Sequence, residues 1–152
     1  MSIRIVAIGK KHESWVAEGI KRYQDRLKKP FDVEWVILPH SSLNGLLARQ
    51  EESGRILSRL GSRDYVVLLD ECGKNVSSTD LALHLNSLLD VSQPIAIIIG
   101  GAFGVDETVA RRANFIWSLS KLVFPHQLVR LLLIEQLYRS QEISAGKPYH
   151  HQ

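Results

Sequence analysis

The sequence predicts a single α/β domain, spanning residues 1–152, built around a mainly parallel sheet. Stretches with strand character and stretches with helix character alternate five times along the chain. The strand stretches are nearly continuous apolar runs, which is typical of strands covered on both faces. The length of 152 residues suits one domain with its own core.

Five strands are expected, each a short apolar run bounded by turn residues or proline. They are residues 2–8, 32–38, 64–70, 94–99 and 115–119. Because the third run ends in Leu68-Leu69-Asp70, the four residues from Glu71 to Lys74 are expected to form a loop.

Helices are expected after each strand, at residues 12–28, 43–60, 77–89, a short one from Asp106 and Glu107, and 125–141. The first carries an apolar stripe and ends before Pro30. Gly54 weakens the second, which is expected to break or be mobile there. Ser77 or Ser78 caps the third, and Pro125 opens the last in its first turn.

The composition is that of a soluble globular protein, with 45% hydrophobic and 23% charged residues. No apolar run approaches the ~20 residues that span a membrane, and the first ten residues are too short and too β-like for a secretory signal. The lone Cys72 excludes an internal disulfide and fits a reducing cytoplasm. It has no partner base at a recognisable spacing, so it is expected to be inert rather than nucleophilic. The six histidines show no metal-ligand spacing, and no metal is expected.

Positive charge is concentrated at the start of the chain. The net charge is only +3, yet residues 1–30 hold eight Lys and Arg against three acids. Such a face suits a phosphate backbone, although an ordinary solvated helix face explains it as well.

Two loops are expected at the carboxyl ends of strands, where open α/β sheets bind ligands. One begins with Gly100 and Gly101, and the other is Ser120-Lys121-Leu122-Val123-Phe124. The glycine pair lacks the spacing of a dinucleotide fingerprint. It is consistent with a ligand lying close to the backbone and with a plain tight turn.

The last helix and the tail carry the other candidates. Residues 128–134 are apolar nearly all round, broken only by Arg130, which predicts a homodimer contact beside the contact with the sheet. Glu135 and Arg139 are spaced as a helix pair, either on the surface or near-buried and functional. The tail, with Tyr149, His150 and His151, is either a disordered end or a reactive cluster.

At these residues the sequence resembles a known family. The run GG-x-x-G, then SLSKL-x-x-PHQLVR-x-LL-x-EQLYR, then PYH near the end, is similar to the bacterial large-subunit ribosomal RNA methyltransferase H family of small SPOUT-class enzymes. The similarity extends to IRIVAIGK at the start and LLDECGK in the middle, so it covers nearly the whole chain.

The resemblance implies a parallel-sheet SPOUT fold with a C-terminal trefoil knot, a homodimer and S-adenosylmethionine as methyl donor. It implies transfer of the methyl group to N3 of a pseudouridine in large-subunit ribosomal RNA, within assembled ribosomes in the cytoplasm. By position, the donor site would comprise Leu69, Gly100, Gly101, Leu119, Ser120, Lys121, Leu122, Val123 and Phe124. The acceptor side would comprise His126, Arg130, Glu135, Arg139, Tyr149 and His150. The chain departs from the family at Ala102 and Phe103, where proline and an acid are frequent.

His150 is the expected general base for the imide proton, with His126 next. Arg139, held by Glu135, would stabilise the developing anion, and Tyr149 would stack on the base or hydrogen-bond to it. Two other functions stay open at this point. One is a non-catalytic ribosome-associated RNA-binding protein, and the other is an α/β enzyme that binds a different nucleotide at the glycine loop.

Overall fold

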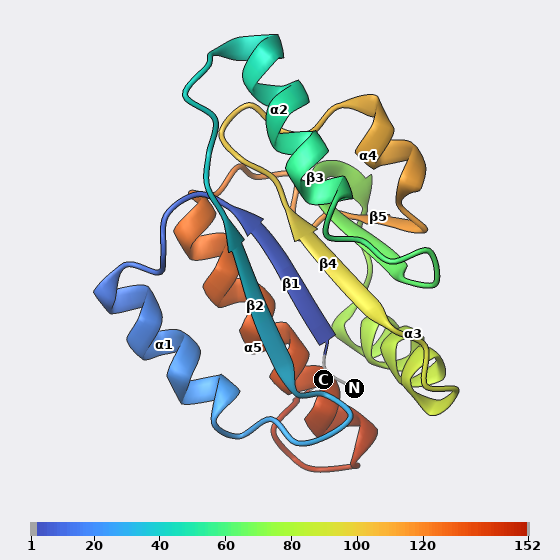
Figure 1. The fold of residues 1–152 in the computed structure, drawn as a ribbon. Coiled ribbons are helices and arrows are strands. Elements are labelled where there is room, and N and C mark those ends of the chain that lie inside the picture. The colour runs from blue at the N-terminus through green and yellow to red at the C-terminus, as the bar shows by residue number, and fades with distance from the viewer. Residues whose placement is uncertain (1–2, 152) are drawn as a thin grey trace.

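A five-stranded parallel sheet runs through the middle of the molecule (Figure 1). The structure is a computed structural model, and it describes residues 3–151. The strand order is β2-β1-β4-β3-β5, and every neighbouring pair is parallel. The strands are β1 (Ile3–Ile8), β2 (Val33–Leu38), β3 (Tyr65–Lys74), β4 (Ile95–Ile99) and β5 (Phe115–Trp117).

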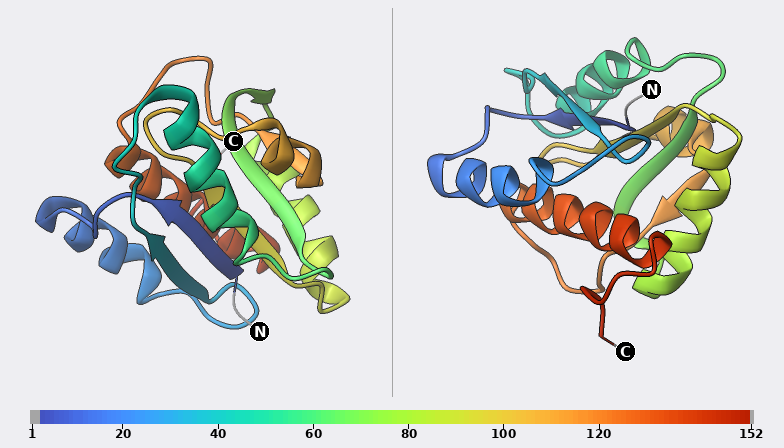
Figure 2. Two further views of the ribbon diagram at one scale, coloured as in Figure 1. Left: turned by 45° about the horizontal axis from the view of Figure 1, so that its top comes forward. Right: turned by 90° about the horizontal axis from the view of Figure 1, so that it is seen from below.

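Helices cover both faces of the sheet (Figure 2). One face carries α1 (Ser14–Gln24), α3 (Ser78–Asp90) and α5 (His126–Ser144), with α5 packed between the other two. The other face carries α2 (Gly45–Leu57) and α4 (Glu107–Arg112). The predicted α/β class, the alternation of strands and helices and the parallel sheet are therefore confirmed. No helix among residues 3–151 is long and apolar enough to cross a membrane.

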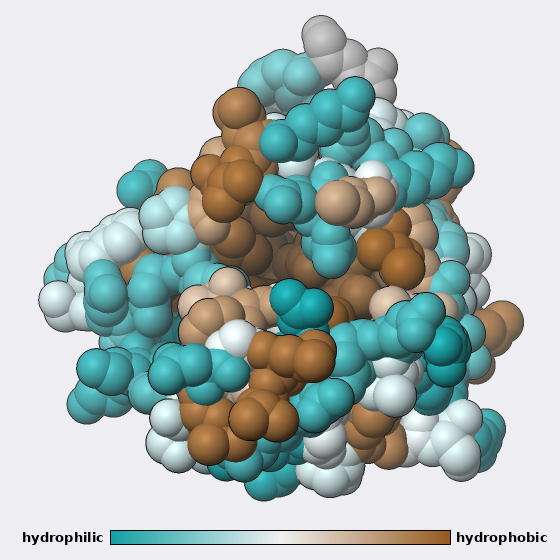
Figure 3. All heavy atoms as spheres, turned by 90° about the horizontal axis from the view of Figure 1, so that it is seen from above, coloured by the Kyte–Doolittle hydropathy of each residue, from teal (hydrophilic) through white to brown (hydrophobic). Residues whose placement is uncertain are grey.

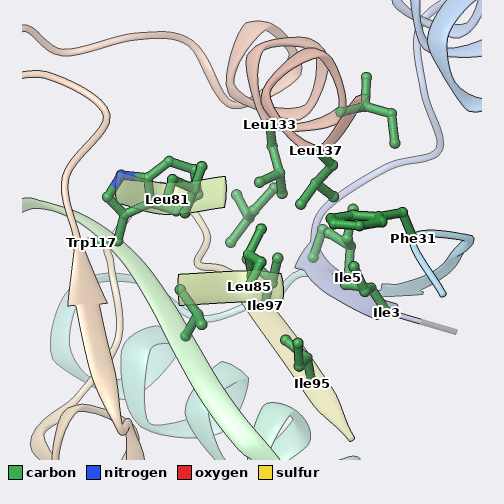
Figure 4. Packing of buried hydrophobic residues seen from close by; sticks show 14 of the residues in the cluster. Ile3, Ile5, Phe31, Leu81, Leu85, Ile95, Ile97, Trp117, Leu133 and Leu137 are labelled. Atoms are coloured by element: carbon green, nitrogen blue, oxygen red, sulfur yellow. The ribbon is translucent and has the colours of Figure 1, made fainter. Parts of the chain in front are cut away.

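The larger of the two cores lies between the sheet and α5 (Figure 4). All five residues of β4 are buried, because the strand is central and covered on both faces. Leu133, Ile134 and Leu137 of α5 are 0% exposed. Burying each such side chain stabilises the fold by roughly 1.5–3 kcal/mol, so α5 is held firmly in place.

The apolar character of α5 is partly explained within the chain. Leu131 packs against α1 at Gly19, where an added Cβ would lie 2.8 Å from a Leu131 methyl carbon. Gln136 accepts a hydrogen bond from Ser78 of α3 at 2.7 Å. The residues that share the outward stripe of α5, by their helical spacing, are Leu128, Leu132, Glu135 and Arg139.

The prediction of a loop directly after Asp70 is wrong. Strand β3 continues to Lys74, which pairs with Trp117 after an irregularity that follows Leu69. The reason is Gly73, whose Cα faces the β5 backbone so closely that a Cβ would lie 2.7 Å from the Ile116 carbonyl oxygen. The pairing of this extension of β3 with the edge strand β5 depends on how the two segments meet in the tertiary structure, and residues 70–74 give no sequence signal of it.

The helix boundaries also differ in places from those expected. The helix α2 is shorter than predicted but runs unbroken through Gly54. The last helix begins at His126, with Pro125 as its N-cap, and continues to Ser144. The Ser77 cap of α3 is confirmed, since its hydroxyl accepts from the Asp80 N–H at 3.0 Å.

We predict opposite effects from two glycine substitutions. Gly73→Ala should destabilise the protein by about 1–3 kcal/mol, because its Cβ meets β5 backbone that cannot rotate away. Gly54→Ala should stabilise it by about 0.5–1 kcal/mol, because the site is helical and a Cβ there meets nothing within 4 Å. Urea unfolding of both variants measures the difference. Equal stabilities would contradict the close pairing of β3 with β5.

Candidate functional site

A first cavity opens at the carboxyl ends of β3, β4 and β5. Figure 3 looks down on this end of the molecule and shows a hollow with apolar walls and a polar surround. Its volume is about 240 Å³. The lining residues come from three loops and the start of α5: Leu69, Asp70, Glu71, Ile99, Gly100, Gly101, Ala102, Gly104, Val105, Leu119, Ser120, Leu122, Val123, Phe124, His126 and Val129.

The glycine loop is both a tight turn and a wall of this cavity. The Gly104 N–H donates to the Gly101 carbonyl at 3.0 Å, and Gly104 has a φ of +74° that favours glycine. At Gly101 the protein itself leaves no room for a side chain, since a Cβ would lie 2.5 Å from Oε1 of Glu52. The two interpretations left open by the sequence are therefore compatible.

Helix α2 anchors the glycine loop from behind. Glu52, 3% exposed, accepts from the Ser41 N–H at 2.8 Å, and the hydroxyl of the fully buried Ser53 accepts from the Asp106 N–H at 2.9 Å. These contacts tie the loop after β2 and the loop after β4 to one helix. Sequence reasoning missed both residues, because polar side chains on a weakly striped helix look like its solvent face.

Eight of the nine expected donor-site residues line the cavity. Lys121 is the exception, being exposed and outside the lining. The sequence did not lead us to Asp70 and Glu71, which add two carboxylates to the wall. Asp70 directly follows the apolar run of β3, so the rule that ligands bind at strand ends could have found it. The walls thus combine apolar groups and backbone with acids, and no Lys or Arg lines the cavity among the described residues.

His126 occupies the first turn of α5, at the cavity wall. Desolvation of the ring, and then the charge of Arg130, lower the pKa of His126. A hydrogen bond to the Gly100 backbone and the charge of Glu52 oppose these effects without cancelling them. The ring is therefore neutral at pH 7. A neutral imidazole keeps one ring nitrogen able to accept a proton.

The tail is docked on α5 as an ordered cluster. Arg139 donates to Oε1 of Glu135 from Nε at 3.0 Å and from a terminal nitrogen at 2.6 Å. The Tyr149 hydroxyl donates to the same oxygen at 3.2 Å, and its ring lies 4.8 Å from the Arg139 guanidinium carbon. Arg139 also lies 3.0 Å from Nδ1 of His150. His151 is exposed beyond this cluster.

The structure separates the expected acceptor residues into two groups. His126 and Glu135 are nine positions apart on one helix, which is about 13 Å along its axis. Neither Glu135, Arg139, Tyr149 nor His150 lines the first cavity. Within one chain, the tail cluster and the cavity are therefore different sites.

The remaining candidates are placed as follows. Arg130 is buried at 1% exposure and lines a second cavity, described below. Cys72 is exposed on the extension of β3, with a free thiol. No group of three or more His, Cys, Asp or Glu within residues 3–151 has the arrangement of a metal site.

Comparison with known proteins identifies the family. The family described as "Predicted SPOUT methyltransferase" matches residues 1–150. The chain belongs to the SPOUT methyltransferase family. Within it, the chain is 38% identical over 158 residues to the ribosomal RNA large subunit methyltransferase H of Desulfitobacterium hafniense, covering 99% of each chain. The proteins of the same name from Natranaerobius thermophilus and Methylobacillus flagellatus are 38% and 37% identical, over 99% of this chain and 100% and 99% of theirs. The resemblance to this methyltransferase family that the sequence predicted is thus confirmed.

The docking of the tail on α5 predicts a raised pKa for Tyr149. Desolvation, the Glu135 charge, Tyr23 and the hydrogen bond to Glu135 raise the pKa of Tyr149 to about 12, against the smaller opposing effect of Arg139. Glu135→Gln removes an anion that disfavours the phenolate, so the pKa should fall, whereas the exposed Glu18→Gln should leave it unchanged. NMR titration of ¹³C-labelled tyrosine rings measures this. Ionisation of Tyr149 near pH 10 in the wild type would mean that the tail is undocked in solution.

Proposed function

We propose that this protein is an S-adenosylmethionine-dependent methyltransferase that modifies N3 of a pseudouridine in large-subunit ribosomal RNA. We propose further that it works as a homodimer on assembled ribosomes in the cytoplasm. One observation carries the proposal: the residues of the family motif, dispersed over three loops of the sequence, come together as the wall of one cavity at the carboxyl end of the sheet.

The chemistry of the first cavity fits the donor. Its backbone-rich and apolar walls suit an adenosine, and the carboxylates of Asp70 and Glu71 suit a ligand that carries a sulfonium and an amino group. Gly100, Gly101 and the 119–124 segment would hold it. When bound, S-adenosylmethionine supplies a methyl group already activated by its positive sulfur. The protein then has to position the acceptor and remove one proton.

His126 is better arranged than His150 to take that proton. Arg139 lies beside Nδ1 of His150 and can only donate, so a neutral His150 carries its proton on Nε2 and has no free acceptor. His126 is neutral, lies on the cavity wall and keeps one nitrogen free. We therefore assign to His126 the acceptance of the N3 proton, and to His150 a hydrogen-bonding role beside Arg139.

The tail cluster fits a role on the oxygens of the acceptor base. Arg139 is a cation oriented by the two hydrogen bonds that it donates to Glu135, which suits stabilisation of the imide anion that forms as N3 loses its proton. Because this cluster lies about 13 Å or more along α5 from His126, a two-fold partner is the simplest way to bring it to a cavity. The outward stripe of Leu128 and Leu132 is the apolar surface on which such a partner would pack.

We also propose the trefoil knot of the family. The chain after β5, at one edge of the sheet, passes over the carboxyl ends of β3 and β4 and enters α5 on the other face. Its path is tied to the β3 extension, since the Ser118 N–H donates to the Lys74 carbonyl at 3.0 Å and Asn75 donates to the Ser118 carbonyl at 3.0 Å. This path supports threading of the C-terminal segment.

Calorimetry and mass spectrometry test the function. The purified protein should bind S-adenosylmethionine at micromolar strength and should not bind NAD or ATP. Large-subunit RNA from cells lacking the gene should have lost one methyl group from a pseudouridine. Binding of NAD or ATP instead would favour an enzyme that uses another nucleotide. Intact methylation in those cells, without donor binding in vitro, would favour a non-catalytic ribosome-associated protein.

The pH dependence of the rate should distinguish the two histidines. The pKa of His126 is lowered, so the acid limb of kcat should lie below pH 6.5, where protonation removes the base. His126→Gln should reduce kcat by about 10²–10⁴ at pH 7 and abolish that limb, with partial recovery at high pH as N3 ionises unaided. His150→Ala should lower kcat while the acid limb persists. A limb lost only in His150→Ala would reverse the assignment.

The dimer should depend on Leu132. Leu132→Glu places a charge in the proposed apolar contact, and sedimentation should then show a folded monomer. Leu133 is unsuitable for this test, because it is 0% exposed and faces the sheet. Leu83→Glu, on an exposed position of α3, is the matched control and should leave the dimer intact. A Leu132→Glu variant that stays dimeric would place the interface elsewhere.

A further inference from the structure

A second and larger cavity, of about 540 Å³, adjoins the first. It opens at the ends of β1 and β4, the central strands from which the sheet extends in opposite directions, and ligands are commonly bound at such a point. The two cavities share Gly101, Ala102 and His126 as a common wall. The cationic and imidazole residues that line the second cavity are Lys10, Lys11, Arg130, His12, His40 and His126.

Arg130 is a buried cation without a matched anion. It is 1% exposed, and one terminal nitrogen donates to the Lys10 carbonyl at 2.8 Å and lies 3.3 Å from Nδ1 of His12. Its Nε has no hydrogen-bond partner among residues 3–151. A buried guanidinium left in this state is costly, which favours completion of the site by an anionic ligand.

The nearby carboxylates do not complete it. Glu13 lies on the cavity wall and attracts Arg130 at a distance, but its Oε2 accepts from the Trp15 indole N–H at 2.7 Å. Glu52 lies behind the glycine loop, with Oε2 bonded to the Ser41 N–H. The cavity therefore keeps an excess of positive charge around an unpaired donor.

The two cavities carry opposite charges, so one is suited to a cationic reactant and the other to an anionic reactant. Asp70 and Glu71 line the first, and Lys10, Lys11 and Arg130 line the second. The shared wall carries His126, to which we assign the proton transfer. A cation held on one side and an anion on the other would both lie next to that imidazole.

We propose that the second cavity is a phosphate subsite, which holds a phosphodiester group of the RNA beside the nucleotide to be methylated. Arg130 is its buried anchor, because a guanidinium pairs with phosphate through two parallel hydrogen bonds. Lys10 and Lys11, which are exposed, form the rim. Contacts of this kind position single-stranded RNA without reading its sequence. The RNA as source of the phosphate rests on the proposed function; the phosphate subsite itself does not.

Inorganic pyrophosphate is the probe for the subsite. In calorimetry at ~0.15 M KCl, where exposed charges are largely screened, the wild type should bind it, and the Lys10→Ala/Lys11→Ala variant should bind about tenfold more weakly. The matched control is Arg59→Ala/Arg63→Ala, which removes two exposed cations at the opposite end of the sheet and should retain wild-type affinity. Arg130→Gln should abolish binding; if that variant does not fold, the lysine pair and its control still decide.

Ribosomes from cells lacking the gene identify the source of the phosphate. If it is RNA, Lys10→Ala/Lys11→Ala should raise KM for ribosomes about tenfold beyond the control, with kcat and the Kd for S-adenosylmethionine unchanged. Weaker pyrophosphate binding with an unchanged KM would keep the subsite and assign it to a free phosphate compound. Wild-type protein that does not bind pyrophosphate, or equal losses in variant and control, would overturn the subsite. Failure to bind S-adenosylmethionine would instead remove the proposed function and leave the pyrophosphate result standing.

Discussion

The burial of α5 against the sheet is the constraint on which the sites depend. Leu133, Ile134 and Leu137 fix the helix between α1 and α3, and a packed helix cannot rotate or slide without losing several kcal/mol of burial. Its first turn then has to present His126 to the end of the sheet. Its second half has to present Glu135 and Arg139 to the outside, where the tail docks. One rigid element thus sets the separation between His126 and Arg139.

The glycine loop shows how packing and ligand chemistry share the same residues. Gly101 is a glycine because Glu52 and Ile8 fill the space where its Cβ would lie. Glu52 in turn holds Ser41, and its neighbour Ser53 holds Asp106, so one buried turn of α2 braces the loops after β2 and β4. A wall braced in this way can separate two cavities with little movement. Ala102, where the chain departs from the family pattern, lines both cavities.

Much of the fold and of the first cavity could be predicted from the sequence. Continuous apolar runs such as Ile95–Ile99 predict buried parallel strands, and the loops at the strand ends predict where a ligand would bind. Prediction failed where a contact between distant segments decided the outcome. Residues 71–74 form strand because Gly73 lets β5 approach, and Lys121 is exposed and does not line the cavity that its neighbours line. Asp70 was within reach of the strand-end rule and was overlooked.

The sequence by itself determined the class of fold, the order of its elements, the family and eight of the residues that line the first cavity, because these follow from local periodicity and from the family motifs. Only the tertiary structure decided that His126 stands apart from Arg139, Tyr149 and His150, that His150 lies against Arg139, and that Arg130 joins Lys10 and Lys11 in a second cavity. The physical reason is that hydrogen-bond partners and charge neighbours are set by the packing of segments against one another, and these can be 120 positions apart, as Arg130 and Lys10 are. Spacing along the chain carries no record of such contacts.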